Sequence, residues 1–458
     1  MIRRLARDLE RRAEGNDRLR KLLGKVFPDH WSFLLGEIAM YSFLVLVATG
    51  VGLLFFYDAS SATTTYDGAY AALNGEEMSK AYASVLRLSF DVPGGLLLRQ
   101  VHHWAALVFP AAIVLHAMRI FFTGAFRRPR RLNWTIGLTM FALAMANGWF
   151  GLTLADDLLA GTGARIGHST FESVPVLGPA LAQLVFAGEP GAEGMIERIF
   201  WIHVLIVPVA LAALLGGHLS RVFRQSHTQH REAGTADRVV GDRAWPSYAL
   251  KTTGLLLVVA GVLVTLGGAA QINPVWIYGP SDPASATVPA QPAWYLGWVE
   301  GGMRVFFPVS VQVFDREIPT PFFSGVAGPL LILAILYAWP FLEERITGDR
   351  AEHHVLDRPR DQPVRTALGA GGIAFLTLLL AAGSHDRQGQ LLGTGVDTMT
   401  SYYRVLLVVV PPIVGLIAHR LCRDLIARDA ITRRLASDDT GGADADPAFA
   451  EPRSREHR

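Results

Sequence analysis

The sequence contains one cysteine, Cys422, among 458 residues. A single thiol excludes an intramolecular disulfide, and it also excludes the Cys-x-x-Cys-His motif that attaches haem covalently. No short apolar segment with a small-residue cleavage site precedes the first long apolar run, so we expect no removable signal peptide. No repeat of 20 to 50 residues is present, although the first four long apolar runs are richer in glycine and histidine than the last four.

Long apolar runs are what the sequence does contain, and hydrophobic residues make up 51% of it. Crossing about 30 Å of hydrocarbon takes roughly 18 or more consecutive apolar residues in a helix. Runs of this length predict an all-α integral membrane protein with eight transmembrane helices, near residues 32–56, 98–123, 134–154, 198–222, 248–269, 322–343, 366–384 and 402–422.

Arginine is concentrated in alternate connections between these runs, as at Arg127, Arg224 and Arg358, and basic residues are also dense before the first run. Basic connections stay on the cytoplasmic side of a membrane. We therefore expect a multi-pass protein of the cell membrane with both termini in the cytoplasm. Nucleic-acid binding by the basic N-terminus is the weaker interpretation, because such residues beside a first span determine topology.

The remaining connections, residues 57–97, 155–197 and 270–321, are the long ones and would lie outside, where function often resides on irregular loops. The second of these contains a stretch from Thr170 typical of short amphipathic surface helices. The predicted division is a basic N-terminus (1–31), an N-terminal four-helix bundle (32–230), a C-terminal part with four helices (231–425) and a disordered cytoplasmic tail (426–458).

Four histidines lie at membrane depth, where ionisable residues are costly and usually functional. His102 and His116 are 14 residues apart in the second run, about 21 Å along a helix, and point nearly the same way. His203 and His218 are 15 apart in the fourth run, about 22 Å. The adjacent His103 is rotated by about 100° and is left out.

The two histidine-bearing runs have the same direction, so His102 shares the outer level with His203, and His116 shares the inner level with His218. Two neutral imidazoles can hold a haem iron without a covalent link. This arrangement predicts a four-helix dihaem bundle with two b-type haems. A buried hydrogen-bonded histidine is the ordinary alternative for any one of the four, but not for four in matching register.

Small residues would allow a haem to approach the neighbouring helices closely. Glycine pairs with 14-residue spacing occur in the first and third runs, at Gly36, Gly50, Gly137 and Gly151. Arg99, three residues before His102, and Arg119, three after His116, are candidate partners for haem propionates. The alternative for each arginine is an interfacial side chain that reaches water.

These features together resemble cytochrome b. The resemblance rests on ArgGlnValHisHisTrp from Arg99, the histidine and glycine pairs and GlnProAlaTrpTyr from Gln291, and it extends from about Phe33 to about Arg423. Further segments, such as PheArgArgProArgArg from Phe126 and GlnIleAsnProValTrp from Gln271, resemble the actinobacterial form of the subunit.

The resemblance implies a quinol-oxidising subunit of a respiratory bc1-type complex that acts with menaquinol, a Rieske iron–sulfur subunit and a cytochrome c subunit. His102 and His203 would hold the low-potential haem near the outer face, and His116 and His218 the high-potential haem. It also implies a homodimer, and a supercomplex with a terminal oxidase. A quinol-oxidising pocket would lie outside, between the loop after Gly151 and GlnProAlaTrpTyr.

Two residues of the oxidation pocket depart from the family. Ala293 replaces an acidic residue, and Ala155 replaces a proline. Alanine cannot accept a quinol proton, so Asp156, Glu300 and Tyr295, together with Asp157, are the candidates to replace it.

On the inner side, a quinone-reducing pocket would lie near the inner haem. Lys251 stands where a quinone-site lysine would be, and is followed by Thr252 rather than an acid; an interfacial anchor is its other interpretation.

Three rival functions stay open at this point. One is a paralogue with impaired quinol oxidation, and another is a dihaem membrane anchor of a different dehydrogenase. The third is a secondary transporter with proton-relaying histidines. The last four runs and the GlnProAlaTrpTyr segment argue against a dehydrogenase anchor, which generally has fewer spans.

Overall fold

The computed structural model describes residues 16–225, 227–230, 239–285, 291–314 and 316–441. Within these residues, eight helices are long and apolar enough to cross a membrane. This agrees with the prediction, and each predicted range overlaps one helix. The helices are Trp31–Leu54, Gly95–Phe122, Arg131–Thr153, Met195–Arg224, Ala244–Ala269, Phe322–Thr347, Pro363–Ala382 and Val396–Thr432.

Several of these spans are assembled from more than one helical segment. The segments that carry them are α3 (Leu34–Leu54), α5 (Gly95–Phe122), α6 (Arg131–Thr153), α9 (Met195–Trp201) with η3 (Ile202–Ile206) and α10 (Val207–Arg224), η5 (Ala244–Tyr248) with α11 (Ala249–Ala269), η7 (Phe322–Ala327) with α14 (Gly328–Thr347), α15 (Pro363–Ala382) and α17 (Val396–Gly441).

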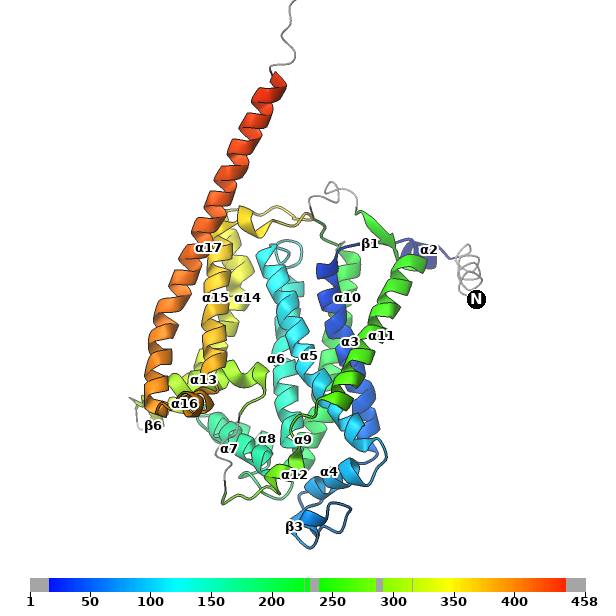
Figure 1. Cartoon of the computed structure of the whole chain (residues 1–458), viewed down its shortest axis with the longest axis vertical. Coiled ribbons are helices and arrows are strands. Elements are labelled where there is room, and N and C mark those ends of the chain that lie inside the picture. Colours follow the sequence, from blue (N-terminus) through cyan, green and yellow to red (C-terminus); the bar gives the residue numbers. More distant parts are fainter. Residues whose placement is uncertain (1–15, 226, 231–238, 286–290, 315, 442–458) are drawn as a thin grey trace, which may run out of the picture.

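The spans form two groups that stand side by side (Figure 1). In one group α3 packs against α5, α6 packs against α10, and α11 covers α3 and α5. In the other group α15 packs against α17, while α14 contacts α6. Apolar side chains on the outer surfaces stay exposed, such as Leu257 at 67% and Val408 at 72%. An exposed apolar surface of this extent suits contact with lipid.

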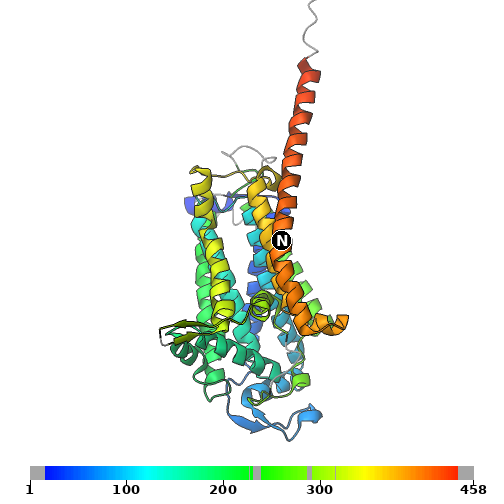
Figure 2. The ribbon, with the colours of Figure 1, turned by 90° about the vertical axis from the view of Figure 1, so that its left-hand side faces the viewer.

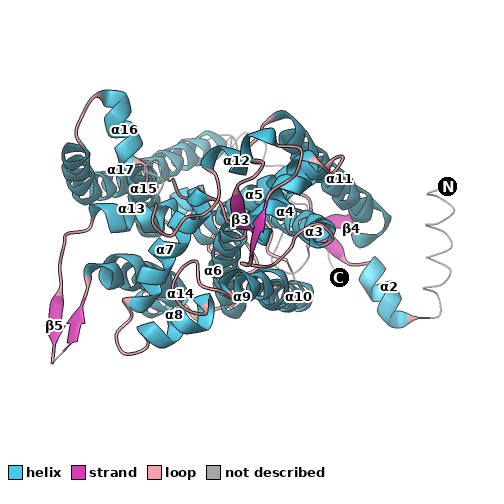
Figure 3. Cartoon of the chain, turned by 90° about the horizontal axis from the view of Figure 1, so that it is seen from below, coloured by secondary structure: helices cyan, strands magenta, loops and turns pink. Residues whose placement is uncertain are grey.

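Short elements gather at the lower end of the molecule in Figure 1, where the long connections lie. Seen from that end, the hairpin of β5 projects at the edge (Figure 3). These elements are the paired strands β2 (Thr63–Thr65) and β3 (Glu77–Ser79), η2 (Ala71–Leu73), α4 (Lys80–Phe90), α7 (Leu158–Glu172), α8 (Gly178–Phe186), α12 (Val275–Tyr278), η6 (Trp294–Leu296), α13 (Gly297–Val305), the paired strands β5 (Val311–Val313) and β6 (Arg316–Ile318), and α16 (His385–Leu392).

The opposite end carries fewer elements. They are α2 (Asp17–Leu23), η1 (Trp31–Phe33), η8 (Pro359–Asp361) and the strand pair β1 (Val26–Pro28) with β4 (Gly241–Arg243), in which Val26 lies opposite Arg243. Both α2 and the last turns of α17 lie at this end (Figure 1). An even number of spans requires this arrangement.

The C-terminal part differs from the prediction of a disordered tail from residue 426. The helix α17 continues without a break to Gly441 and extends beyond the other helices (Figure 2). Its sequence explains the difference, because Asp424 precedes Arg428 by four residues, a spacing that supports an exposed helix. Asp429 also pairs with Arg360 of η8 at 2.7 Å. Residues 442–458, and residues 1–15 of the basic N-terminus, lie outside the described part.

Candidate functional site

The outer histidines lie opposite one another between α5 and the fourth span. The ring centroids of His102 and His203 are 6.3 Å apart, and their planes are inclined by 77°. Two imidazoles that bind one metal from opposite sides, with bonds of about 2 Å, place their ring centroids about 6 Å apart. The separation therefore suits a shared iron between the two rings.

Hydrogen bonds at the outer pair leave the Nε2 atoms for a metal. The Nδ1 atom of His203 lies 3.0 Å from the Asn147 carbonyl oxygen, to which it can only donate. Thr49 gives its hydroxyl proton to the Val45 carbonyl at 2.6 Å, so its oxygen accepts from Nδ1 of His102 at 2.9 Å. A donating Nδ1 leaves Nε2 with its lone pair, as an iron ligand requires.

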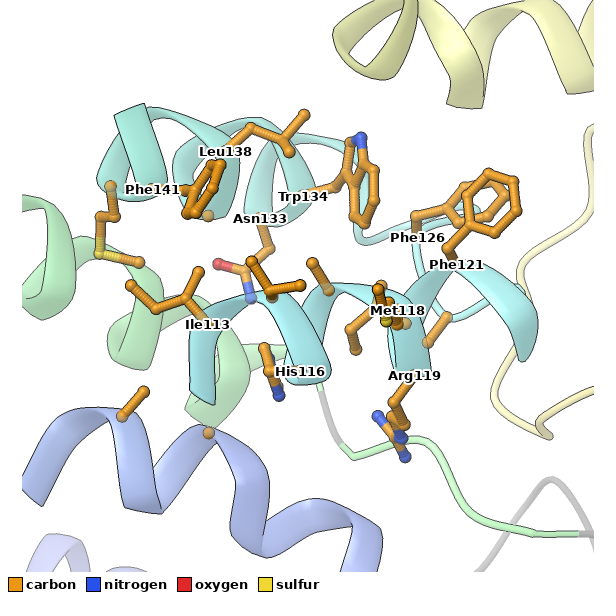
Figure 4. Close-up of a pocket in the computed structure, with 18 of the residues that line it drawn as sticks. Ile113, His116, Met118, Arg119, Phe121, Phe126, Asn133, Trp134, Leu138 and Phe141 are labelled. Atoms are coloured by element: carbon orange, nitrogen blue, oxygen red, sulfur yellow. The ribbon is translucent and has the colours of Figure 1, made fainter. Parts of the chain in front are cut away.

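The inner histidines have the same arrangement. The centroids of His116 and His218 are 6.5 Å apart, with planes inclined by 69°. Both line a cavity of about 1040 Å³, which is at the upper end of the range for small-molecule sites. His116 and Arg119 project from the same side of α5 into this cavity (Figure 4).

A local irregularity aligns the fourth span with α5. His203 lies in the π-helical segment η3, followed by Pro208 in the first turn of α10. Proline lacks the N–H that a regular α-helix would use, and a π segment contains one extra residue per turn. The extra residue compensates for the 15-residue spacing between His203 and His218, so that they match a pair spaced by 14.

Each of the four predicted glycines lies beside one of the four histidines. The atom nearest to a Cβ added at the glycine is Cε1 of a histidine, at 3.1 Å for Gly36 and His116, 3.3 Å for Gly50 and His102, 2.6 Å for Gly151 and His203, and 3.9 Å for Gly137 and His218. The absence of a side chain at each glycine therefore makes room for an imidazole ring. The spacing had predicted room for the haem itself, whereas the residue in contact with each glycine is the histidine.

The two arginines predicted to bind haem propionates, Arg99 and Arg119, are largely buried, and some of their guanidinium nitrogen atoms have no hydrogen-bond acceptor among the described residues. Arg99 donates one hydrogen bond to the Asn273 carbonyl at 3.1 Å, but its Nη1 has no partner among the described residues. Nε and Nη2 of Arg119 also have no hydrogen-bond partner among the described residues. The Cζ atom of Arg119 lies 4.1 Å from the centroid of the Phe33 ring. Buried guanidinium atoms without acceptors fit anionic groups such as haem propionates.

Tyr295 is one of the three predicted catalytic residues and lies deep in the protein, with 2% of its surface exposed. A Cβ added at Gly148 of α6 would come 2.4 Å from its hydroxyl oxygen. The neighbouring Trp294 donates to the Leu107 carbonyl of α5 at 3.2 Å. The GlnProAlaTrpTyr segment therefore packs against both α5 and α6. Trp294 and Tyr295 also line the cavity that contains the inner histidines. Burial raises the pKa of Tyr295, so its hydroxyl stays protonated.

Asp156 follows α6 in a left-handed backbone conformation, with φ at +47°. Its carboxylate accepts a hydrogen bond from Ser79 at 2.5 Å, and its carbonyl accepts from the Ser281 amide at 3.0 Å. Burial, with a smaller contribution from the adjacent Asp157, raises its pKa from 3.8 to about 6. A carboxyl group with this pKa can exchange protons near neutral pH.

Asp157 is the N-terminal cap of α7, where it accepts from the Ala160 amide at 2.7 Å. Burial raises its pKa to about 6 as well. Its carboxylate therefore has a structural partner, and this bond to the backbone competes with any role in proton transfer.

Glu300 has different surroundings. It pairs with Arg304 at 2.5 Å, and Arg304 also pairs with Asp386 at 2.9 Å. Its pKa is raised by burial, against the opposing effect of Arg304. Among the described residues no hydrogen bond or ion pair joins Glu300, Asp156 and Tyr295, so the structure does not assemble them into one catalytic group.

The inner end of the cavity contains an acidic group, Glu37, that the sequence did not single out. Glu37 of α3 accepts hydrogen bonds from Tyr248 and from Thr252, the latter at 2.7 Å. All three residues line the cavity, as does Lys251. Glu37 could have been noticed, because it is an acidic residue inside an apolar run directly after Gly36. Its partners, Tyr248 of η5 and Thr252 of α11, could not be inferred without the packing.

The fold and the paired histidines define a helical membrane protein of the electron-transport type. A family model described as "Cytochrome b(N-terminal)/b6/petB" matches residues 107–280. A solved structure titled "Hyperthermophilic respiratory Complex III" has the same fold, with a TM-score of 0.63, 20% identity, and coverage of 90% of this chain and 98% of that one.

Curated relatives named "Cytochrome bc1 complex cytochrome b subunit" show the family. The protein of Mycobacterium tuberculosis (strain ATCC 25618 / H37Rv) is 45% identical over 431 residues, covering 94% of this chain and 78% of the relative. That of Corynebacterium diphtheriae is 44% identical, covering 90% and 76%, and that of Streptomyces coelicolor is 42% identical, covering 88% and 74%.

The chain belongs to the cytochrome b subunits of the cytochrome bc1 complex. The membership confirms the resemblance, and with it a multi-pass membrane subunit of an oxidoreductase complex that binds b-type haem. The assignment of individual residues to haem and quinone stays a prediction.

Proposed function

We propose that the chain carries electrons from a quinol, menaquinol by its resemblance, across the cell membrane through two b-type haems. The observation that supports this most is the pair of facing imidazoles at each of two levels, with centroid separations of 6.3 and 6.5 Å. Bound b-type haems would supply one-electron transfer. His102 with His203 would hold the outer haem, and His116 with His218 the inner one.

The chain's other groups orient the haems and anchor their charges. Thr49 and the Asn147 carbonyl fix the two outer imidazoles, and Arg99 and Arg119 would receive propionates through guanidinium atoms that lack protein acceptors. The four glycines keep side chains away from the imidazoles.

Quinol oxidation on the outer side would use the region where the segment after α6 meets residues 279–281. Asp156 is the best candidate among the three for accepting the quinol proton. Its pKa of about 6 suits proton exchange, whereas Glu300 is committed to Arg304 and Tyr295 stays protonated. Protons released from this side would leave outside the membrane.

A subunit with impaired quinol oxidation is the second candidate, and one observation favours it. Ala293 and Ala155 carry no proton-accepting group, and the nearest alternatives are not joined into one site. In that case both haems would be reducible while quinol-driven turnover failed. Restoring a carboxylate with Ala293→Glu should then raise the rate.

The proposed assembly contains a Rieske iron–sulfur subunit, a cytochrome c subunit and a second copy of this chain, with a terminal oxidase in a larger supercomplex. Membership of the bc1 cytochrome b subunits supports the complex itself. The arginines at the end of the bundle that carries α2 support cytoplasmic termini.

Two measurements on the purified complex test the proposal. A reduced-minus-oxidised spectrum should show two b-type haems per chain, and His102→Ala and His116→Ala should each remove one. Quinol-dependent reduction of cytochrome c should occur in the same preparation. Absence of b-type absorbance would refute the haem assignment, and absence of turnover with both haems reducible would favour the second candidate.

A further inference from the structure

The cavity that contains the inner histidines is also lined by a carboxylate, that of Glu37. Glu37 directly follows Gly36, whose missing side chain makes room for the His116 ring at 3.1 Å. Glu37 and His116 line the same cavity, and so do Tyr41, Tyr248 and Thr252. The carboxylate and the inner imidazole therefore face one space large enough for a quinone ring.

Hydroxyl groups hold both oxygens of this carboxylate. Tyr248 donates to Oε1, and Thr252 donates to Oε2 at 2.7 Å. Tyr41 in turn bonds to the Thr252 hydroxyl, and because Thr252 donates to Glu37, Tyr41 is the donor in that bond. The Glu37 carboxylate joins α3 to α11 through this network.

The hydroxyl partners allow Glu37 to take and release a proton. A hydroxyl can donate to an ionised carboxylate and accept from a protonated one, whereas a lysine or an arginine can only donate. The described ion pairs include no cation bound to Glu37. Its charge is consequently not locked by a salt bridge, in contrast to Glu300 with Arg304.

Exposed charged groups line the same cavity as Glu37. Lys251, next to Thr252 on α11, pairs with Asp29 at 2.9 Å and with Asp242 at 2.5 Å. Asp242 also accepts from Ser247 at 3.1 Å, and Lys251 is half exposed. Lys251, Asp29 and Asp242 line the cavity too, and because Lys251 and Asp29 are exposed, water can reach this part of the cavity.

We propose that Glu37 is the proton donor to a quinone bound in the inner cavity, and that it is reprotonated from the side of Lys251, Asp29 and Asp242. Reduction of a quinone takes two electrons and two protons, one proton at each carbonyl oxygen. A bound b-type haem would supply the electrons one at a time. Glu37 gives the proton to the carbonyl oxygen that faces it as its own O–H bond breaks and is then reprotonated from water, and the other carbonyl oxygen takes its proton from water.

This inference rests on the quinone-reducing pocket that the resemblance implies near the inner haem, and the experiment separates the two. The assembled complex is reduced anaerobically and mixed with a short-chain naphthoquinone, and reoxidation of the b haems is followed per reducible haem. If the wild-type complex is not reoxidised, the inner quinone-reducing function fails, and the assignment of Glu37 fails with it.

With an active wild type, Glu37→Gln should slow reoxidation by about tenfold or more, since general acid catalysis contributes roughly 10²- to 10⁴-fold. Glu37→Asp, which keeps the carboxyl group, should recover part of the rate. Glu76→Gln, at an exposed glutamate of the outer connection, should match the wild type.

A purely structural Glu37 predicts another pattern. Glutamine would then preserve the link between α3 and α11, and the rate and its slowing in heavy water would both stay as in the wild type. That result would overturn the proposal. If Glu37→Gln binds too little haem to measure, the reoxidation rates of Glu37→Asp and Thr252→Val test the proposal instead. A wild-type rate in both overturns the proposal, whereas a reduced rate per haem in both supports it.

Discussion

At the residue scale, the surroundings of the four histidines depend on the glycines beside them, whose lack of a side chain leaves space for the imidazole rings. The four glycines of α3 and α6 lie at different distances from the four imidazoles, from 2.6 Å at Gly151 to 3.9 Å at Gly137. A contact of 3.9 Å is ordinary van der Waals contact, but 2.6 Å is an overlap that requires movement. The same substitution should therefore have different effects at the two positions.

Gly151→Ala should displace the His203 ring and lower the content of the outer haem by half or more. Gly137→Ala should leave the inner haem in place, because its new methyl group only touches His218. Haem content per chain and the spectrum of each haem measure the difference. Equal effects of the two substitutions would contradict the role of the glycines in admitting the imidazoles.

The raised pKa of Asp156 carries a second residue-scale prediction. Only the ionised carboxylate can accept a proton, and burial sets its pKa at about 6 rather than 3.8. Turnover should therefore decline as the pH falls through about 6. Asp156→Asn should reduce quinol-dependent cytochrome c reduction by about tenfold or more, the lower part of the effect of an acid–base group, and abolish this decline.

The exposed Asp67, which pairs weakly with Arg87 at 3.6 Å, supplies the control. Asp67→Asn should keep both the rate and its dependence on pH. A profile with the same decline near pH 6 in Asp156→Asn would show that another group accepts the proton.

At the scale of elements, the π segment η3 decides how the fourth span presents its histidines. His203 and His218 are 15 residues apart, and the extra residue of η3 brings them into line with the 14-residue spacing in α5. A regular helix would turn His203 by about 100° away from the partner. Pro208 favours the irregularity, although Pro110 lies inside α5 without one.

Deletion of Leu205 from η3 should therefore be tolerated, because the spacing becomes 14 and a regular helix then suffices. Deletion of Leu115 from α5 leaves a spacing of 13 with no π segment to absorb the change, and should remove at least one haem. Both leucines have exposed side chains, at 51% and 50%, so the two deletions differ little in packing. Haem content per chain distinguishes them, and loss of haem from the Leu205 deletion would contradict this account.

At the scale of the whole molecule, the two ends differ in construction. One end carries the arginine-rich connections, α2 and the emergent part of α17, and the other carries the long connections with their short helices (Figure 1). A charge difference of this kind orients a membrane protein with its basic side in the cytoplasm.

Labelling of introduced cysteines tests this orientation. In a Cys422→Ser background, Glu76→Cys in the outer connection should react with a membrane-impermeant maleimide in intact cells. Arg350→Cys, whose native side chain is 80% exposed on the other end, should react only after the membrane is opened. Labelling in the reverse order would overturn the proposed topology.

Much of this architecture is local and could be predicted without the fold. A span reveals itself by its apolar length, and residues on one helix face by their spacing, so the eight spans, the histidine levels and the glycine pairs follow from the sequence. The helical continuation of α17 does not follow from composition, although the four-residue spacing of Asp424 and Arg428 is typical of an exposed helix. The pairing of Glu300 with Arg304 has the same four-residue spacing and is equally local, whereas Asp386, which also pairs with Arg304, belongs to a distant segment and is brought there only by the packing.

The sequence by itself therefore determined the class of protein, the number of candidate spans and which histidines lie within them. Only the tertiary structure decided which glycine faces which histidine, how η3 aligns His203 with His102, and that Glu37 meets Tyr248 and Thr252. The physical reason is the difference between local interactions along one helix and contacts between helices that are distant in the sequence. Periodicity along one helix is set by its own residues, whereas contacts between helices depend on how separate apolar faces pack and rotate against each other.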